Sequence, residues 1–303
     1  MSDIKLFKIG EQGVSELEGH SAAVEKSIQT LLEKHLENFL GVRFLASEYA
    51  TGKTHGGRID SLGIDENNSP VIIEYKRALN ENVINQGLYY LDWLLDHKAE
   101  FTLLVMNTLG KQLSEKIAWG STRLLCIAGD FTKFDQHAVQ QINRNIELIR
   151  YRQYGNDLLM LDLVNATTAT GDVGQVDIKK TTKGPYKTVA EYLHQAPQEL
   201  KDLYEEVKAF LLAMGDDVQE KELQNYFAFR RIKNFACVEV HPGSGKLLVF
   251  VKVPPQTITL EKGFTRDVTN IGHFGTGDLE ITLKGHADFE KAKSLLVKSY
   301  EAS

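Results

Sequence analysis

Three charged residues with the spacing of a metal site lie in one short stretch, GGRIDSLGIDENNSPVIIEYK, which runs from Gly56 to Lys76. Side chains alternate faces along a strand, so Glu74 and Lys76 share one face. The turn formers in ENNSP predict a hairpin that folds Asp60 back toward them. Mg²⁺ takes carboxylate ligands, and a nearby lysine can activate water or neutralise charge on a phosphate. We therefore expect a site for metal-dependent phosphodiester hydrolysis.

An ion pair at a sheet edge would explain the same charges without any chemistry. In this alternative Lys76 bridges Glu74 and Asp60, and Glu-x-Lys spacing is common in ordinary strands. The residues favour a site because VIIEYK places the polar pair at the end of an otherwise apolar strand, where unpaired charge is costly. The other two acids of the hairpin, Asp65 and Glu66, lie beside the turn, and we expect them to be solvated.

The apolar pattern predicts the elements that position this hairpin. A helix over 21–40 stops at Gly41, and strands follow over 42–49, 58–64 and 71–76. The remaining elements of the first part are predicted as a helix over 80–97, a buried strand over 101–106, a helix over 111–118, a strand over 123–128, a helix over 132–145, and strands over 146–152 and 158–164. This order indicates an α/β fold with a mixed sheet flanked by helices.

A Thr-, Gly- and Lys-rich stretch over 166–185 has no hydrophobic periodicity and is the expected linker. It separates a domain over 1–165 from a smaller one over 186–303. The second domain is expected to be α+β, with helices over 189–193, 199–213 and 221–226, strands over 236–240, 247–253 and 278–283, and a closing helix over 287–301.

Composition limits the partners and the compartment. The 303 residues carry a net charge of −6, which excludes a strongly basic binder, so nucleic acid would be met through a local patch or through metal ions. Cys126 and Cys237 lie in apolar runs without metal-site spacing, as buried thiols of a reducing compartment do. The first residues lack the apolar core of a signal peptide, and apolar runs are too short to span a bilayer. We expect a cytoplasmic protein without a membrane partner.

The motif RIDSLGID…PVIIEYKRA resembles the PD-(D/E)xK nuclease superfamily, and within it the NucS-like and RecB-like endonucleases. Ile59 stands where the family motif has proline. The resemblance spans residues 20–165 and implies a restriction-endonuclease-like fold. It also implies that Asp60, Glu74 and the main-chain carbonyl of Tyr75 bind Mg²⁺ or Mn²⁺, while Lys76 positions or activates water.

The same resemblance extends the site to two helices. Gln86, in NQGLYYL, matches the helix glutamine of the family, and Glu25, in VEKSIQTLLEKHLE, matches its first-helix acidic residue. Two more acids of that helix, Glu33 and Glu37, are expected to be solvated. Residues that could touch phosphate or bases nearby are Arg58, Arg77 and Tyr90, and for the two arginines plain solvation is an equal alternative.

The second domain resembles an uncharacterised C-terminal domain that is found on such nuclease-like chains, some of which are labelled predicted transport proteins. Its stretch YFAFRRIKNFA interleaves aromatic residues with Arg230, Arg231 and Lys233, as nucleic-acid platforms do. A core strand with inward aromatics and solvated charges is the favoured alternative.

Taken with the resemblance, the residues predict a metal-dependent endonuclease that hydrolyses DNA, in repair or in defence. The alternative is a non-catalytic module that retains a nuclease fold and binds nucleic acid or protein. Small nucleases often form dimers to reach both strands of a duplex, so this chain could also act as a homodimer.

Overall fold

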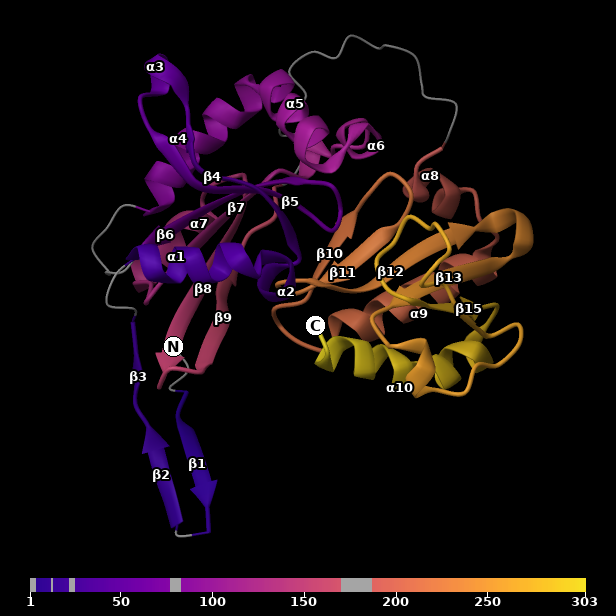
Figure 1. Ribbon diagram of the computed structural model, residues 1–303. Coiled ribbons are helices and arrows are strands. Elements are labelled where there is room, and N and C mark those ends of the chain that lie inside the picture. Colours follow the sequence, from indigo (N-terminus) through magenta and orange to yellow (C-terminus); the bar gives the residue numbers. More distant parts are fainter. Residues whose placement is uncertain (1–3, 12, 22–24, 77–82, 170–186) are drawn as a thin grey trace. The chain divides into compact units, whose positions relative to one another are not determined.

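The computed structural model describes residues 4–11, 13–21, 25–76, 83–169 and 187–303. The chain forms two compact units, Met1–Val176 and Asp177–Ser303, and their boundary falls inside the stretch 166–185. Both units are mixtures of helices and sheets, so the protein is of the mixed α/β class (Figure 1). Along the described ranges, no helix has the length and apolar composition that crossing a bilayer requires.

The N-terminal unit is built on a seven-stranded sheet in the order β3-β8-β7-β6-β5-β4, with β9 beside β8. Its strands are β3 (Gly19–His20), β4 (Val42–Ala50), β5 (Arg58–Asp65), β6 (Pro70–Lys76), β7 (Arg123–Ala128), β8 (Asn145–Tyr154) and β9 (Leu158–Ala166). The strands β4, β5 and β6 pair antiparallel, whereas β6, β7 and β8 pair parallel. Every residue of β7 is buried, as in strands covered on both faces.

Helices cover both faces of this sheet. They are α1 (Glu25–Lys34), α2 (Leu36–Leu40), α3 (Gly52–His55), α4 (Val83–Asp96), α5 (Lys98–Leu109), α6 (Lys111–Ser114) and α7 (Lys133–Gln140), with a 3₁₀ turn at Trp119–Ser121. On one face, Leu62, Ile72 and Leu124 share a core with α4 and α5. The alternate residues Ser61 and Tyr75 face the other side, where α1 packs on β5 and β6.

The apolar run Phe101–Met106 is part of helix α5, so the predicted strand is wrong. Within the run, Phe101 and Val105 are buried while Leu103 is half exposed. This four-residue spacing is that of a helix packing one side on the core, which a short continuous apolar run cannot reveal.

Helix ends also differ from the sequence pattern. The expected helix over 21–40 is divided at His35 into α1 and α2, and Gly41 ends α2 in the left-handed region with φ 63°, as predicted. The expected helix over 111–118 is the single turn α6. The helix α7 begins at a capping box of Thr132 and Asp135 and ends at Gln140, short of the predicted residue 145.

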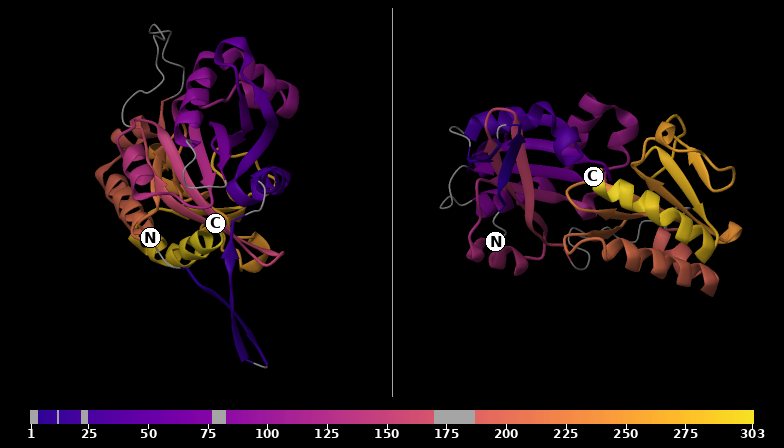
Figure 2. Two further views of the ribbon diagram at one scale, coloured as in Figure 1. Left: turned by 90° about the vertical axis from the view of Figure 1, so that its left-hand side faces the viewer. Right: turned by 90° about the horizontal axis from the view of Figure 1, so that it is seen from below.

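A two-stranded hairpin, β1 (Leu6–Gly10) and β2 (Gly13–Leu17), projects from the N-terminal unit (Figures 1 and 2). The strands pair antiparallel, with Phe7 opposite Glu16 and Ile9 opposite Val14. Phe7, Ile9 and Val14 are exposed. The sequence pattern does not predict this hairpin, because it lacks the alternation of buried and exposed residues.

The C-terminal unit has a six-stranded antiparallel sheet in the order β10-β11-β12-β13-β15-β14. Its elements are α8 (Val189–His194), α9 (Gln198–Leu212), β10 (Gln219–Glu222), β11 (Phe227–Arg230), β12 (Asn234–His241), β13 (Lys246–Val251), β14 (Thr265–Asp267), β15 (Leu279–Leu283) and α10 (His286–Glu301), with 3₁₀ turns at Pro242–Ser244 and Pro255–Thr257. Helices α9 and α10 lie side by side on this sheet and close the main core (Figure 2). The expected helix over 221–226 is wrong, because residues 219–222 form an edge strand.

Candidate functional site

Asp60 and Glu74 meet on neighbouring strands at the end of the β5–β6 ladder. The last paired residues of this ladder are Ser61 and Ile73. Beyond them, the main-chain N–H of Asp60 donates to Glu74 Oε1 at 3.2 Å, and the N–H of Tyr75 donates to Asp60 Oδ2 at 3.0 Å. The two carboxyl groups therefore join the strands where main-chain pairing stops.

The two acids differ in their access to water. Glu74 is 0% exposed, whereas Asp60 is half-buried. Cys126 faces Glu74 across the β6–β7 ladder, and burial, with Glu74 adding to it, raises the pKa of this thiol above its ordinary value. The inner end of the site is thus a dry environment, in which a charge interacts strongly with its neighbours.

Lys76 ends β6 on the same face as Glu74 and is half-buried. It lies opposite Ala128 in the parallel ladder. The structure thus places the three residues of the predicted triad at one end of two adjacent strands. The two remaining predicted positions here, Arg77 and the side chain of Glu25 at the start of α1, lie outside the described part of the chain.

Gln86 joins this end of the sheet through Tyr90, one turn further along α4. Gln86 Nε2 donates to Tyr90 Oη at 3.4 Å, and Tyr90 Oη also accepts from the main-chain N–H of Arg58 at 3.2 Å. A β-carbon at Gly57 would lie 2.5 Å from that hydroxyl. The ring of Tyr90 is buried, so its predicted contact with nucleic acid is wrong, because its hydroxyl holds the start of β5 instead.

A second polar group supports Asp60 from the face that α1 covers. Gln29 is 3% exposed, and its Nε2 donates to the main-chain carbonyl of Asp60 at 2.8 Å and to Glu33 Oε1 at 2.9 Å. Glu33 Oε1 also accepts from Ser61 Oγ at 2.6 Å. The expectation that Glu33 is merely solvated is therefore wrong, whereas Glu37 is exposed as predicted.

Glu48 adds a carboxylate that the sequence did not single out. It lies between Ser47 and Tyr49, which pair with Ser61 and Ile59 of β5, and its φ of 51° is unusual for a residue with a side chain. Glu48 pairs with Lys26 at 2.8 Å and with Arg58 at 3.5 Å. The bond from Lys26 lowers the pKa of Glu48, and the charge of Arg58 adds to this. The side chain of Arg58 is 67% exposed, so its predicted phosphate contact stays a prediction.

A buried ion triad lies at the far end of the hairpin. Arg123 pairs with Asp65 at 2.9 Å and with Glu147 at 2.7 Å, and all three side chains are almost fully buried. Burial alone would lower the pKa of Arg123, but the two carboxylates outweigh it and raise that pKa. Asp65 is therefore not the solvated turn residue that was expected. It holds the turn through two N–H groups, from Asn67 and Ser69.

The aromatic and basic stretch of the C-terminal unit is a core strand with its following turn. Its aromatic residues Tyr226, Phe227, Phe229 and Phe235 are buried, which confirms the inward aromatics of the favoured alternative but not its solvated charges. Arg230 is buried as well and donates to the carbonyls of Arg231 and Ile232, so its predicted contact with nucleic acid is wrong. Arg231 pairs with Asp217 at 2.7 Å, and Lys233 is half-buried; for both, binding stays a prediction.

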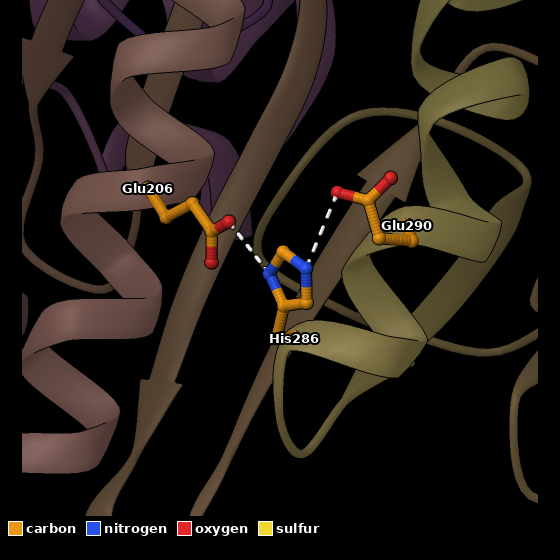
Figure 3. A group of neighbouring side chains, drawn as sticks. All are labelled: Glu206, His286 and Glu290. Carbon is orange, nitrogen blue, oxygen red and sulfur yellow. Dashed lines mark hydrogen bonds and ion pairs between the residues drawn. The ribbon is translucent and has the colours of Figure 1, made fainter.

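Glu206, His286 and Glu290 form a cluster on helices α9 and α10 that could hold a metal ion (Figure 3). The two imidazole nitrogens of His286 face the two carboxylates, with Nδ1 at 2.7 Å from Glu206 and Nε2 at 3.6 Å from Glu290. Lys293 also pairs with Glu290. His286 is exposed, so the contacts are those of a surface network of polar groups that bridges two helices.

Comparison with known proteins assigns no activity to either unit. Residues 189–303 match a family described as "Domain of unknown function (DUF5655)", which covers nearly the whole described part of the C-terminal unit. The chain is similar to an "Uncharacterized protein" of Haemophilus influenzae, with 28% identity over 301 residues that span 97% of this chain and 98% of that protein. No solved structure matches the chain.

Proposed function

We propose that the N-terminal unit is a restriction-endonuclease-like domain that hydrolyses DNA phosphodiester bonds with Mg²⁺ or Mn²⁺. The observation that carries this proposal is the pair of hydrogen bonds by which the Asp60 and Glu74 carboxyl groups each bind the other's strand, with Lys76 on the same face of β6 as Glu74. The mixed strand order from β4 to β8 and the helices on both faces of the sheet are compatible with such a domain.

The donor atoms at this point suit a hard divalent cation. Carboxylate and carbonyl oxygens are the ligands that Mg²⁺ and Mn²⁺ prefer. Asp60, Glu74 and the main-chain carbonyl of Tyr75 would hold the ion. A bound ion would supply a water of lowered pKa and would stabilise negative charge on the phosphate.

The protein side chains have separate tasks in this proposal. Lys76 would orient the attacking water and take its proton or balance the charge that develops on phosphate. Gln86 would orient groups at the site from α4, and exposed Arg58 would contact the DNA backbone. Gln29, on α1, donates to the main-chain carbonyl of Asp60. This bond holds Asp60 in place, so its carboxyl group would not have to rearrange when an ion binds.

One observation favours a rival function. Glu74 is fully buried, as it would be in a domain that keeps the fold but binds nucleic acid or protein without cleaving it. The two proposals differ in metal binding, because a non-catalytic scaffold has no need of a divalent ion at Asp60.

The test compares cleavage and metal binding in the full chain and in two isosteric variants. Asp60→Asn keeps an oxygen for the N–H of Tyr75, and Glu74→Gln keeps one for the N–H of Asp60, but each removes a negative charge. We expect the full chain to bind Mn²⁺ in calorimetry and to cleave single-stranded, duplex or branched DNA, and each variant to lose both properties.

Glu37→Gln, on the exposed side of α2, is the matched control and should retain both. RNA of the same sequences tests the assignment of DNA as substrate. Cleavage that survives in Asp60→Asn and Glu74→Gln would refute the site. Absence of Mn²⁺ binding in the full chain would support the non-catalytic rival.

A further inference from the structure

A pocket of about 630 Å³ lies in the C-terminal unit beside the end of β12. Its polar and aromatic lining comes from four separate segments: Lys187, Tyr192, Asn225, Glu239, His241 and Phe274. The volume is within the range of sites that enclose a small molecule. All of these residues belong to the C-terminal unit, so nothing in this inference depends on the proposed nuclease activity.

A buried carboxylate lines the pocket. Glu239 is 8% exposed, and its Oε2 contacts His241 Nε2 at 2.9 Å. A carboxylate has two oxygens and about four acceptor positions, so one imidazole leaves room for further donors. Because burying a carboxylate is costly, a ligand that brings N–H groups to Glu239 would be favoured over one that brings acceptors.

Two exposed aromatic residues line the same pocket. Phe274 is 59% exposed and Tyr192 is 36% exposed. The neighbour of Phe274, His273, stacks on Phe250 with ring centroids 4.5 Å apart, which anchors the segment that carries Phe274. Exposed rings on an anchored segment can stack on a planar ligand, and such stacking is tolerant of which base is present.

Two further lining residues, Lys187 and Asn225, favour a ligand with an anionic group and polar edges. Lys187 is exposed and provides a cation, and the amide of Asn225 offers both a donor and an acceptor. A ligand that fits must therefore have a planar ring, an edge of N–H donors and an anionic group. Nucleotides combine all three.

We propose that this pocket binds a guanine nucleotide, with the base edge on Glu239 and the phosphate toward Lys187. Guanine presents two adjacent N–H donors, from its ring N1 and its exocyclic amine, and these match the two oxygens of one carboxylate. Adenine presents a single donor beside a ring acceptor, which a carboxylate repels. The pocket should therefore distinguish guanine from adenine by hydrogen bonding and not by shape alone.

The test is calorimetric titration of the full chain with GMP, IMP and AMP. IMP keeps the N1–H of guanine but lacks its amine, so we expect it to bind roughly 10- to 100-fold more weakly than GMP, the loss that accompanies one bond to a charged group. AMP should show no saturable binding over the same range. Guanosine lacks the phosphate and so cannot form the ion pair with Lys187; it should therefore bind more weakly than GMP.

Two variants connect the binding to the pocket. Glu239→Gln should remove the preference for GMP over IMP. Its control is Glu280→Gln, a buried carboxylate of the same sheet that pairs with Arg266 at 2.6 Å and does not line the pocket. Phe274→Ala removes an exposed ring and does not endanger folding; it should weaken GMP roughly 5- to 100-fold through lost stacking.

Equal affinity for GMP and AMP would overturn the proposal, as would the lack of binding of any of these nucleotides at millimolar concentration. GMP binding that is unchanged in both Glu239→Gln and Phe274→Ala would place the nucleotide elsewhere and would equally refute this pocket.

Discussion

Asp60 and Glu74 each bind the main chain of the other's strand, since Glu74 Oε1 accepts from the N–H of Asp60 and Asp60 Oδ2 accepts from the N–H of Tyr75. The main-chain ladder between β5 and β6 ends at Ser61 and Ile73, the residues next to Asp60 and Glu74. The orientation of both carboxyl groups is consequently fixed by the strands themselves. A ligand that needs these two groups would find them already positioned, so little conformational entropy would be lost on binding.

Lys76→Met should separate catalysis from metal binding. The methionine keeps the apolar stem of the side chain but removes the ammonium group. If Lys76 acts on water or phosphate, we expect cleavage to fall roughly 10²- to 10⁴-fold, because this is the usual loss of one acid–base group. Calorimetry should find Mn²⁺ still bound, since Asp60 and Glu74 remain. Lys53→Met, at an exposed position of α3, serves as control. Loss of Mn²⁺ binding in Lys76→Met would instead indicate a structural role.

Gln29→Ala should lower both stability and activity. The amide donates to the Asp60 carbonyl, to Glu33 and to Ser47, at distances between 2.8 and 3.3 Å. Its removal takes a donor away from each of these three part-buried acceptors, so the free energy of unfolding should fall by about 1–3 kcal/mol, since each hydrogen bond contributes roughly 0.5–1.5 kcal/mol. Urea denaturation measures this change. Glu37→Ala, exposed on α2, should stay within about 0.5 kcal/mol of the wild type. Equal stability of the two variants would contradict the bonds assigned to Gln29.

Arg123→Met should be among the more damaging substitutions of the N-terminal unit. It removes the cation that pairs with both Asp65 and Glu147, and both carboxylates stay buried. Breaking a buried ion pair from one side costs about 3–5 kcal/mol. Thermal and urea unfolding give the value. Arg58→Met removes an exposed guanidinium and should cost at most about 1 kcal/mol. A small effect at Arg123 would mean that the two acids take up protons or water readily.

The free energy of unfolding should fall at high pH because of the ionisation of Tyr49. Burial first, and then its hydrogen bond to Glu100, raise the pKa of Tyr49 from 10.0 to about 12. Since the unfolded chain ionises this phenol at lower pH than the folded chain, the stabilisation is complete below pH 10 and is lost as pH rises through about 12. Tyr49→Phe should show a shallower decline over that window. Denaturation at a series of pH values tests this, with pH 7–9 as the internal control, where the two slopes should coincide. Parallel curves above pH 10 would refute the assignment.

The bounds of β4, β5, β6 and β7 were predicted from the sequence to within about two residues. Short alternating or wholly apolar runs that are flanked by turn formers are typical of strands and of few other elements. The same reasoning failed at Phe101–Met106, where a continuous apolar run has no visible period. It also failed at the N-terminal hairpin, whose apolar side chains Ile9 and Val14 are exposed and therefore carry no pattern of burial.

The candidate site was predictable only where its residues are close in the sequence. The hairpin alone brings Asp60 toward Glu74, so alternation was enough to pair them. Glu33 and Asp65 gave no such signal, because their partners Ser61 and Arg123 come from other segments, and solvation is the ordinary state of an isolated acid. The left-handed backbone of Glu48 could not be predicted either, since nothing in its type requires it.

Gly57 and Tyr90 have a consequence for how this sequence can vary. A methyl group at position 57 would lie 2.5 Å from the hydroxyl that receives the N–H of Arg58. In a library of random substitutions, a larger residue at position 57 should survive only beside a smaller one at position 90. The second change would in turn remove the acceptor of Arg58 and loosen the strand that carries Asp60. The two positions are therefore expected to be epistatic, and the most accessible route away from glycine passes through variants with a weakened site.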